Sequence, residues 1–183
     1  MYDLPVGEPI DWKVQSISVR DEGLVGTLFL PSTPPPYPVV ITVGGSGGGI
    51  FSAPGALLAS RGIAALALAY FGMEHLPRYL QSIPLEYFGT AIRWCGQHVA
   101  LRANAIAIAW SSRGGELALL LAATYPEIVA VVGWVASGII WPGLHPETKE
   151  RPVVAGLAPG NKRAPSCSVV VERQRSSVRT NPS

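Results

Sequence analysis

The residues best suited to catalysis stand in the stretch WSSRGG, which begins at Trp110. A serine at a sharp turn from a strand into a helix can act as a nucleophile, and the usual pattern, G-x-S-x-G, keeps its neighbours small. Ser112 with Gly114 matches the second half of this pattern, although Trp110 replaces the first glycine. For Ser111 the second-half position holds Arg113, so Ser112 is the better candidate. The alternative is an ordinary helix N-terminus, where serine is a common cap.

A second stretch, GGSGGG at 44–49, could assist such a serine. Glycine adopts backbone conformations closed to other residues, so its N–H groups can face a ligand. We expect the amides of Gly45, Ser46 and Gly47 to help hold the oxyanion that forms when a serine attacks a carbonyl. The Arg113 amide would be the other donor. The alternative is a phosphate-binding turn, but G-x-G-x-x-G is a loose pattern and the chain has no P-loop lysine.

Short apolar runs alternate with helical patterns and predict the elements that must position these residues. The expected strands are Val14–Val19, Leu24–Leu30, Pro38–Val43, Ile63–Ala69, Ala105–Trp110 and Ile128–Trp134, and the expected helices are Ser52–Gly62, Glu86–His98 and Gly114–Tyr125. Asp21-Glu22-Gly23 predicts the turn of an antiparallel hairpin, and Ser52 is the expected N-cap of the first helix. Buried strands joined through helices favour an α/β fold, with a mostly parallel sheet covered on both faces.

Composition places the chain among globular proteins of a single domain. It has 183 residues, of which 48% are hydrophobic and 14% charged, and its net charge is +2. That charge is too small to indicate a nucleic-acid partner. The longest apolar run, Ile128 to Trp141, is shorter than the roughly 20 residues that cross a membrane. Cys95 and Cys167 form no disulfide framework or metal motif, which favours a cytoplasmic protein without a metal.

The end of the chain differs in composition from the rest. Residues 159–183 are rich in serine, arginine and proline, and only Ser168–Glu172 could form a strand there. We therefore expect an incomplete domain at 1–158, followed by a disordered basic tail at 159–183.

Several segments, in order and spacing, resemble a known family. GLVGTLFLP, GSGGG, GALLASRGIAALALAYFG, LEYF and SSRGGEL are similar to the C-terminal catalytic domain shared by acyl-CoA thioesterases and bile acid-CoA:amino acid N-acyltransferase. The resemblance covers about Val14 to Gly138, and the run from Gly55 to Phe88 is its most specific part.

The resemblance implies an α/β-hydrolase fold, dienelactone-hydrolase-like, that acts on fatty acyl-CoA thioesters with a serine or cysteine nucleophile. By position the nucleophile is Ser112, and a serine favours hydrolysis over transfer of the acyl group to an amine. The substrate would be a small acyl thioester or ester, and no cofactor is implied. The family domain continues with further strands that carry the acid and the histidine, so we expect the last strands to be missing here and an apolar sheet edge to be exposed.

The partners that would activate Ser112 are not evident in the sequence. In this fold the acid and then the histidine follow the serine, and every aspartate of the chain precedes Ser112. His145 is the histidine that follows it and is the candidate base, while Glu172 has the setting of a strand end. We interpret His75 as a loop residue near the pocket and His98 as the end of a helix.

Three functions remain open from the sequence. The first is an acyl-CoA thioesterase-like serine hydrolase, impaired because its acid and histidine are not found. The second is a non-catalytic remnant or acyl-binding protein that keeps half of the site. The third assigns nucleic-acid or anionic-membrane binding to the basic tail, whereas the net charge predicts neither partner.

Overall fold

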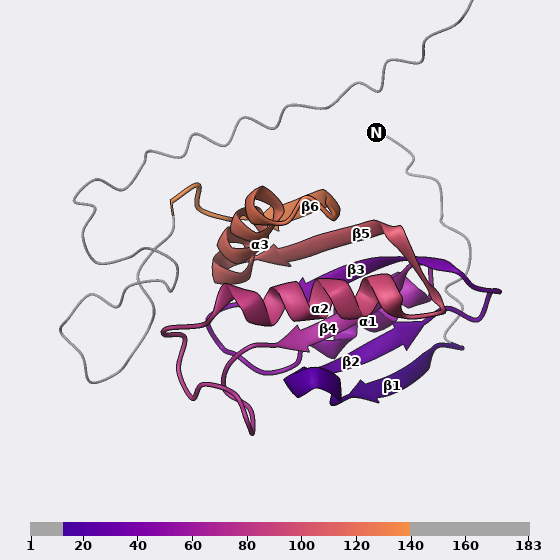
Figure 1. The fold of residues 1–183 in the computed structure, drawn as a ribbon, viewed down its shortest axis with the longest axis horizontal. Helices are drawn as coiled ribbons and strands as arrows, with labels where there is room; N and C mark the ends of the chain where they lie inside the picture. Colours follow the sequence, from indigo (N-terminus) through magenta and orange to yellow (C-terminus); the bar gives the residue numbers. More distant parts are fainter. Residues whose placement is uncertain (1–12, 140–183) are drawn as a thin grey trace, which may run out of the picture.

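The computed structural model describes residues 13–139. The predictions for His145, for the Ser168–Glu172 strand, for Glu172 and for the 159–183 tail lie outside the described residues. Within 13–139 the chain forms one six-stranded sheet with helices packed against it (Figure 1).

The sheet is mixed, with an antiparallel part at one side and a parallel part at the other. Its strands, in sequence order, are β1 (Gln15–Val19), β2 (Val25–Leu30), β3 (Tyr37–Val43), β4 (Ala64–Ala69), β5 (Leu101–Ser111) and β6 (Ile128–Trp134). Their spatial order is β1-β2-β4-β3-β5-β6. Strands β1, β2 and β4 pair antiparallel, and β4, β3, β5 and β6 pair parallel. The predicted hairpin and mostly parallel sheet are thereby confirmed.

The hairpin between β1 and β2 turns at the predicted residues. Asp21–Gly23 form a short 3-10 turn, closed by a hydrogen bond from the Leu24 amide to the Asp21 carbonyl, 2.8 Å. Glu22 and Gly23 have φ angles of 51° and 77°, the left-handed conformation in which glycine is least strained.

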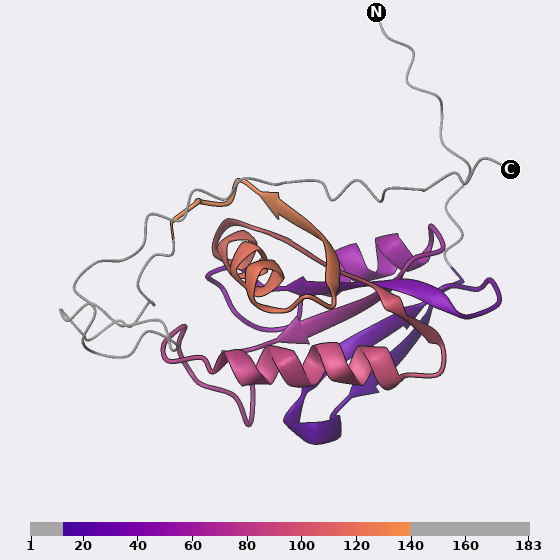
Figure 2. The ribbon, with the colours of Figure 1, turned by 45° about the horizontal axis from the view of Figure 1, so that its top comes forward.

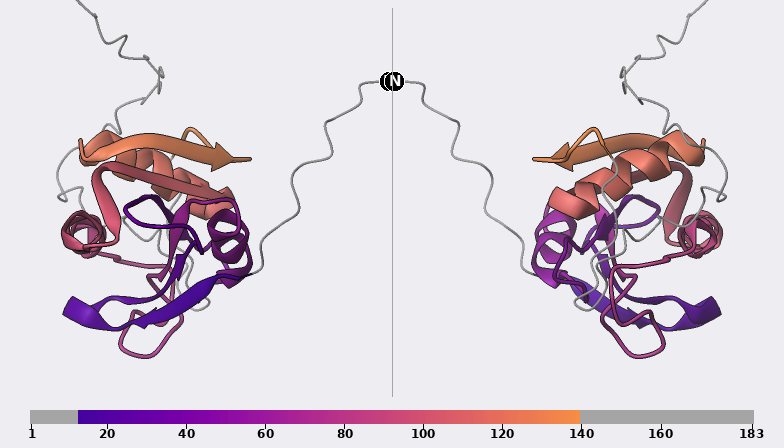
Figure 3. Two further views of the ribbon diagram at one scale, coloured as in Figure 1. Left: turned by 90° about the vertical axis from the view of Figure 1, so that its right-hand side faces the viewer. Right: turned by 90° about the vertical axis from the view of Figure 1, so that its left-hand side faces the viewer.

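The helices α1 (Ser52–Ala59) and α2 (Leu85–Gln97) cover opposite faces of the sheet (Figure 3). The sequence of β4 explains both layers, because AALALA alternates small and large side chains. Leu66 and Leu68 face the core that α2 and α3 (Ser112–Thr124) share, while Ala65 and Ala67 face α1. The alanines leave room for α1 to approach closely, and a methyl group added to its Gly55 would lie 2.6 Å from the Phe29 ring.

Most boundaries lie within one residue of the sequence predictions, and the larger differences are in α1, which ends at Ala59 rather than Gly62, and at the starts of β5 and α3. Ser52 is the first residue of α1, and its N-cap is Phe51, which makes no side-chain capping bond. Strand β5 begins at Leu101 rather than Ala105, and α3 begins at Ser112 rather than Gly114. The last change brings the helix start directly to the end of β5.

Strand β6 forms where it was predicted, but it is not covered on both faces. Its only buried residue is Ile128, and Val132 and Trp134 are 59% and 71% exposed. It lies at the end of the sheet opposite β1, and within residues 13–139 it pairs with β5 alone (Figure 2). An edge strand lacks a neighbour on one side, so its apolar sequence does not guarantee its burial.

Candidate active site

Ser112 stands at the turn from β5 into α3 with a strained backbone. Its φ is +53°, and the residue as a whole is exposed. A positive φ is uncommon for residues other than glycine, because it strains the backbone. Strained residues of this kind are concentrated at functional sites. Ser111 before it is extended (φ −115°, ψ 163°), and its hydroxyl makes no capping bond. The geometry is therefore that of a sharp strand-to-helix turn that presents a serine, rather than that of a serine-capped helix.

The two glycines after Arg113 allow this turn to pack tightly. A methyl group added to Gly114 would lie 2.5 Å from the Gly44 carbonyl oxygen and 2.7 Å from Cδ1 of Trp110. One added to Gly115 would lie 2.7 Å from Cβ of Ala136. Glycine is thus required at both positions, and the missing side chain of Gly114 makes room for the tryptophan that breaks the sequence pattern.

Trp110 occupies the position of the first glycine of G-x-S-x-G without blocking the turn. Its ring packs edge-on against Phe51, with the ring centroids 5.1 Å apart and an interplanar angle of 61°. The bulk of this side chain is accommodated between the start of α3 and Phe51, the residue that precedes α1.

The glycine-rich loop after β3 lies beside the same turn. A methyl group added to Gly45 would have the Ser111 carbonyl oxygen as its nearest neighbour, at 3.8 Å. The far end of the loop is bound to the segment after β4, because the Gly49 amide donates to the Phe71 carbonyl at 3.1 Å. Gly48 has φ +66°, and a methyl group there would lie 2.8 Å from the Phe71 ring, so no larger residue fits.

The middle of the loop is open to solvent. Ser46 and Gly47 are exposed, and an added methyl group at Gly47 would meet nothing within 4 Å. Of the two glycines among the predicted oxyanion donors, Gly45 is the one whose added methyl group would have an atom of the turn within 4 Å.

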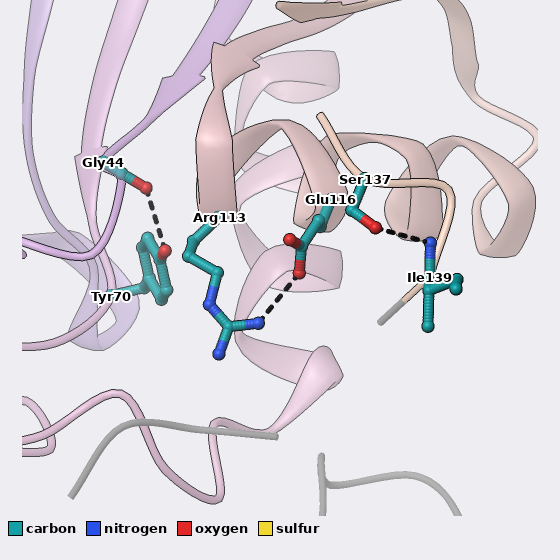
Figure 4. Close-up of polar contacts among 6 residues, drawn as sticks. All are labelled: Gly44, Tyr70, Arg113, Glu116, Ser137 and Ile139. Atoms are coloured by element: carbon teal, nitrogen blue, oxygen red, sulfur yellow. Dashed lines mark hydrogen bonds and ion pairs between the residues drawn. The ribbon is translucent and has the colours of Figure 1, made fainter. Parts of the chain in front are cut away.

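A buried polar group that the sequence interpretation missed lies next to this loop. The Tyr70 hydroxyl donates a hydrogen bond to the Gly44 carbonyl, 2.9 Å, and both groups are buried (Figure 4). Burial raises the pKa of Tyr70, and the positive charge of Arg113 opposes this only in part. The hydroxyl therefore stays protonated and available as a donor. No pattern marks a tyrosine for this role, because its partner is distant in sequence.

The side chain of Arg113 forms an ion pair within α3. Its guanidinium donates to Oε2 of Glu116 at 3.0 Å, and the two side chains are 15% and 10% exposed. An arginine in the first turn of a helix is unfavourable for the helix dipole, and Glu116 offsets this charge. The spacing of three residues is the signal that could have predicted the pair. In Figure 4 the arginine extends between Tyr70 and Glu116.

The two described histidines lie in different segments, one after β4 and one at the end of α2. His75 follows β4, at the carboxyl end of the sheet, where it is exposed and lies 3.5 Å from the Glu74 carboxylate. His98 ends α2, as predicted. Its Nδ1 accepts a hydrogen bond from the Ala100 amide, and its ring packs on Trp94. Because β5 starts beside His98 and reaches Ser112 only at its other end, His98 is about 30 Å from the serine.

Other reactive groups within residues 13–139 do not form a site. Cys95 is a free thiol at the centre of the core, where burial raises its pKa to about 12, so it is not a nucleophile at neutral pH. In this part of the chain no group of three or more His, Cys, Asp or Glu residues could hold a metal ion. The same residues include no helix that is both long and apolar enough to cross a membrane.

Solved structures and characterised proteins resemble this fold and sequence. The chain superposes on the alpha/beta hydrolase GrgF from Penicillium sp. sh18 with a TM-score of 0.53 and 18% identity, over 67% of this chain and 45% of that one. At this identity the likeness shows the fold, which is that of α/β hydrolases.

Two acyl-coenzyme A thioesterases are similar to this chain in sequence. The chain is 37% identical to human acyl-coenzyme A thioesterase 1, over 72% of this chain and 30% of the human protein. It is also 37% identical to rat acyl-coenzyme A thioesterase 2, mitochondrial, over 65% of this chain and 26% of that protein. The chain thus spans less than a third of the length of these relatives.

The family match covers the second half of the molecule, including the end of β5, the turn at Ser112 and α3. Residues 83–175 match the family described as "BAAT / Acyl-CoA thioester hydrolase C terminal". The resemblance inferred from the sequence motifs is confirmed, and the chain belongs to the BAAT / acyl-CoA thioester hydrolase C-terminal family.

Proposed function

We propose that this chain is a serine hydrolase that acts on acyl-CoA thioesters, with Ser112 as its nucleophile. The observation that supports this most directly is the φ of +53° at Ser112, at the carboxyl end of β5 and beside a glycine-rich loop. The relatives named as acyl-CoA thioesterases support the substrate class. Because the chain spans only part of their length, activity and substrate are proposals for this protein.

Hydrolysis of the thioester would need a nucleophile, a base and donors for the oxyanion. The Ser112 hydroxyl loses its proton to a base as its oxygen attacks the thioester carbonyl, and the CoA thiolate leaves as the carbonyl re-forms. Water then attacks the acyl-serine ester and releases the fatty acid. The Gly45 and Arg113 amides hold the oxyanion in both steps, and Ser46 and Gly47 shape the same loop. No cofactor is needed for this reaction.

The candidate base in this proposal is His145, the histidine that follows Ser112 in the chain. No acid that would orient it is assigned, so we propose that the activity of this chain is impaired. Replacing His145 by alanine tests this assignment. If the chain turns over acyl-CoA and this variant loses the activity, His145 is the base. An unchanged rate removes it from the mechanism.

A second candidate function is acyl binding without catalysis. It is favoured by the histidines of residues 13–139, since His75 pairs with Glu74 and His98 accepts a hydrogen bond from the Ala100 amide, and neither hydrogen-bonds to Ser112. In this case the site would bind the acyl group, but the serine would lack activation.

A fluorophosphonate probe distinguishes the two candidates, because it labels only an activated serine. Because we propose an impaired hydrolase, we expect slow labelling at a single peptide containing Ser112, and we expect Ser112→Ala to abolish the labelling. Ser111→Ala is the matched control, since its hydroxyl makes no capping bond. Absence of labelling in the natural chain, together with retained acyl-CoA binding, would favour the second candidate.

We further propose the cytoplasm as the location. Cys95 is a free thiol, which suits a reducing compartment. One relative is named mitochondrial, so recovery of the protein with mitochondrial markers on cell fractionation would contradict this location.

A further inference from the structure

We propose that Tyr70 is a positioning residue for the oxyanion site, because its hydroxyl fixes the peptide group whose N–H belongs to Gly45. This inference rests on the proposed function, in which the Gly45 amide is an oxyanion donor. The contact that carries it is the hydrogen bond from the Tyr70 hydroxyl to the Gly44 carbonyl, 2.9 Å (Figure 4).

The geometry of one peptide unit links Tyr70 to the Gly45 amide. The carbonyl of Gly44 and the N–H of Gly45 belong to the same planar group and, in a trans peptide, point in opposite directions. A donor that holds the carbonyl oxygen therefore also sets the direction of the N–H. It polarises that N–H as well, because hydrogen bonds in series strengthen one another.

This peptide needs an external constraint. It lies between two glycines, whose backbone angles are the least restricted, so it could rotate as a unit at low cost. The Gly44 carbonyl is also close to the start of α3, since a methyl group added to Gly114 would lie 2.5 Å from its oxygen. Tyr70 on one side and the helix start on the other confine the carbonyl to one orientation.

Tyr70 is itself held rigidly. It follows β4 directly and is 2% exposed. Its ring packs against Phe71 and Phe88, with centroids 5.0 Å and 5.5 Å away. A rigid ring fixes the hydroxyl in place, so little conformational freedom is lost when the hydrogen bond forms.

The simpler interpretation is a core tyrosine that satisfies its hydroxyl and has no further role. Tyr125 is the matched example, because its hydroxyl donates to the Leu85 carbonyl at 2.8 Å, away from the glycine loop. The two tyrosines make the same kind of bond, but the acceptor of Tyr70 belongs to the peptide that carries the Gly45 N–H. Comparing Tyr70→Phe with Tyr125→Phe therefore separates positioning from general stabilisation.

The first measurement is fluorophosphonate labelling of the full chain, resolved into the binding constant of the probe and the rate constant of bond formation. In Tyr70→Phe we expect bond formation to slow about tenfold with binding unchanged, because misdirecting one oxyanion donor costs less than removing it. In Tyr125→Phe both constants should stay within about twofold. Equal slowing in the two variants, or none in either, overturns the proposal.

The second measurement is the NMR order parameter of the Gly45 amide, which reports the mobility of this peptide. It should fall from about 0.85 towards about 0.6 in Tyr70→Phe and not in Tyr125→Phe, because only the first releases this peptide. The order parameter needs no catalysis, so the two proposals fail separately. A natural chain that is never labelled refutes the hydrolase, while an unchanged Gly45 order parameter in Tyr70→Phe refutes the role of Tyr70.

A third variant covers the case in which Tyr70→Phe does not fold. Replacing Tyr70 by 3,5-difluorotyrosine keeps the ring and the hydroxyl and makes the hydroxyl a stronger donor. We expect the order parameter of the Gly45 amide to equal that of the natural chain or to be higher. A fall towards about 0.6, with the protein still folded, would contradict the proposal.

Discussion

Strands β4 and β6 are both short apolar runs, and each pairs in parallel with one neighbour, β3 and β5 respectively. Their exposure to solvent is nevertheless opposite. All six residues of β4 are buried, whereas β6 buries only Ile128. Strand β4 lies between β2 and β3, and β6 pairs with β5 alone among residues 13–139. The comparison shows that an apolar run predicts a strand, while the strand's position in the sheet decides its burial.

The candidate site lies at the ends of β4 and the strands next to it. The loop after β3, the residues after β4 and the end of β5 meet at the carboxyl edge of the sheet, where open α/β sheets bind their ligands. Each of the three contributes a close contact, through Gly44, Tyr70 and Gly114. The region around β6 instead exposes apolar side chains, and its close contact with the turn is that of Ala136 with Gly115.

The largest expected contrast is in stability. Leu66→Ala in β4 should lower the free energy of unfolding by about 2–5 kcal/mol. Leu66 is 0% exposed, so the substitution leaves a cavity in the core. Val132→Ala in β6, at 59% exposure, should change it by less than about 0.5 kcal/mol. Urea unfolding of both variants measures the difference. Similar losses would mean that β6 is covered in solution.

The next contrast concerns two glycines, one in the turn of the candidate site and one after β6. Gly114→Ala should destabilise the protein by about 1–3 kcal/mol, since the new methyl group would meet two backbone carbonyls, of Gly44 and Val43, at 2.5 Å and 3.0 Å. Gly138, which follows β6, has open space around it, so Gly138→Ala should have an effect under about 0.5 kcal/mol. Thermal unfolding tests the pair, and a neutral Gly114→Ala would show that the turn is looser than described.

A smaller effect is expected at Thr42 on β3. Its hydroxyl is buried and makes no hydrogen bond among the described residues. Thr42→Val removes an unsatisfied polar group at nearly constant shape and should raise the free energy of unfolding by about 1 kcal/mol. Thr124→Val is the control, because that hydroxyl already donates to the Leu120 carbonyl. A loss of stability in Thr42→Val would reveal a partner for this hydroxyl.

The smallest effect on stability is expected at Trp134, which is 71% exposed. Trp134→Lys should change unfolding by less than about 0.5 kcal/mol, yet reduce self-association, because a charge blunts an apolar edge strand. Light scattering at rising concentration measures the association. Trp134→Phe keeps the apolar surface and should associate as the natural chain does. Equal association of the lysine variant would show that β6 is not the contact surface.

The comparison also explains which features could be predicted from the sequence. The strands from Ala64 to Ala69 and from Ile128 to Trp134 were predicted with nearly correct limits, as both have short apolar runs. Both strands were predicted to be buried, but only the first is. Exposure depends on neighbouring elements, which a local pattern does not specify. The catalytic roles of Ser112, Gly45, Ser46, Gly47, Arg113 and His145 stay predictions.

By itself, the sequence determined the order of strands and helices and the place of Ser112 at a strand-to-helix turn. These features depend on backbone preferences within a few residues, such as the periodicity of apolar side chains and the glycines after Arg113. Only the tertiary structure decided that Tyr70 holds the carbonyl of Gly44, a partner 26 residues away, and that Trp110 fits beside Gly114. Such contacts arise when β3, β4 and β5 are placed side by side. No local pattern encodes them, because they depend on which strands become neighbours in the sheet.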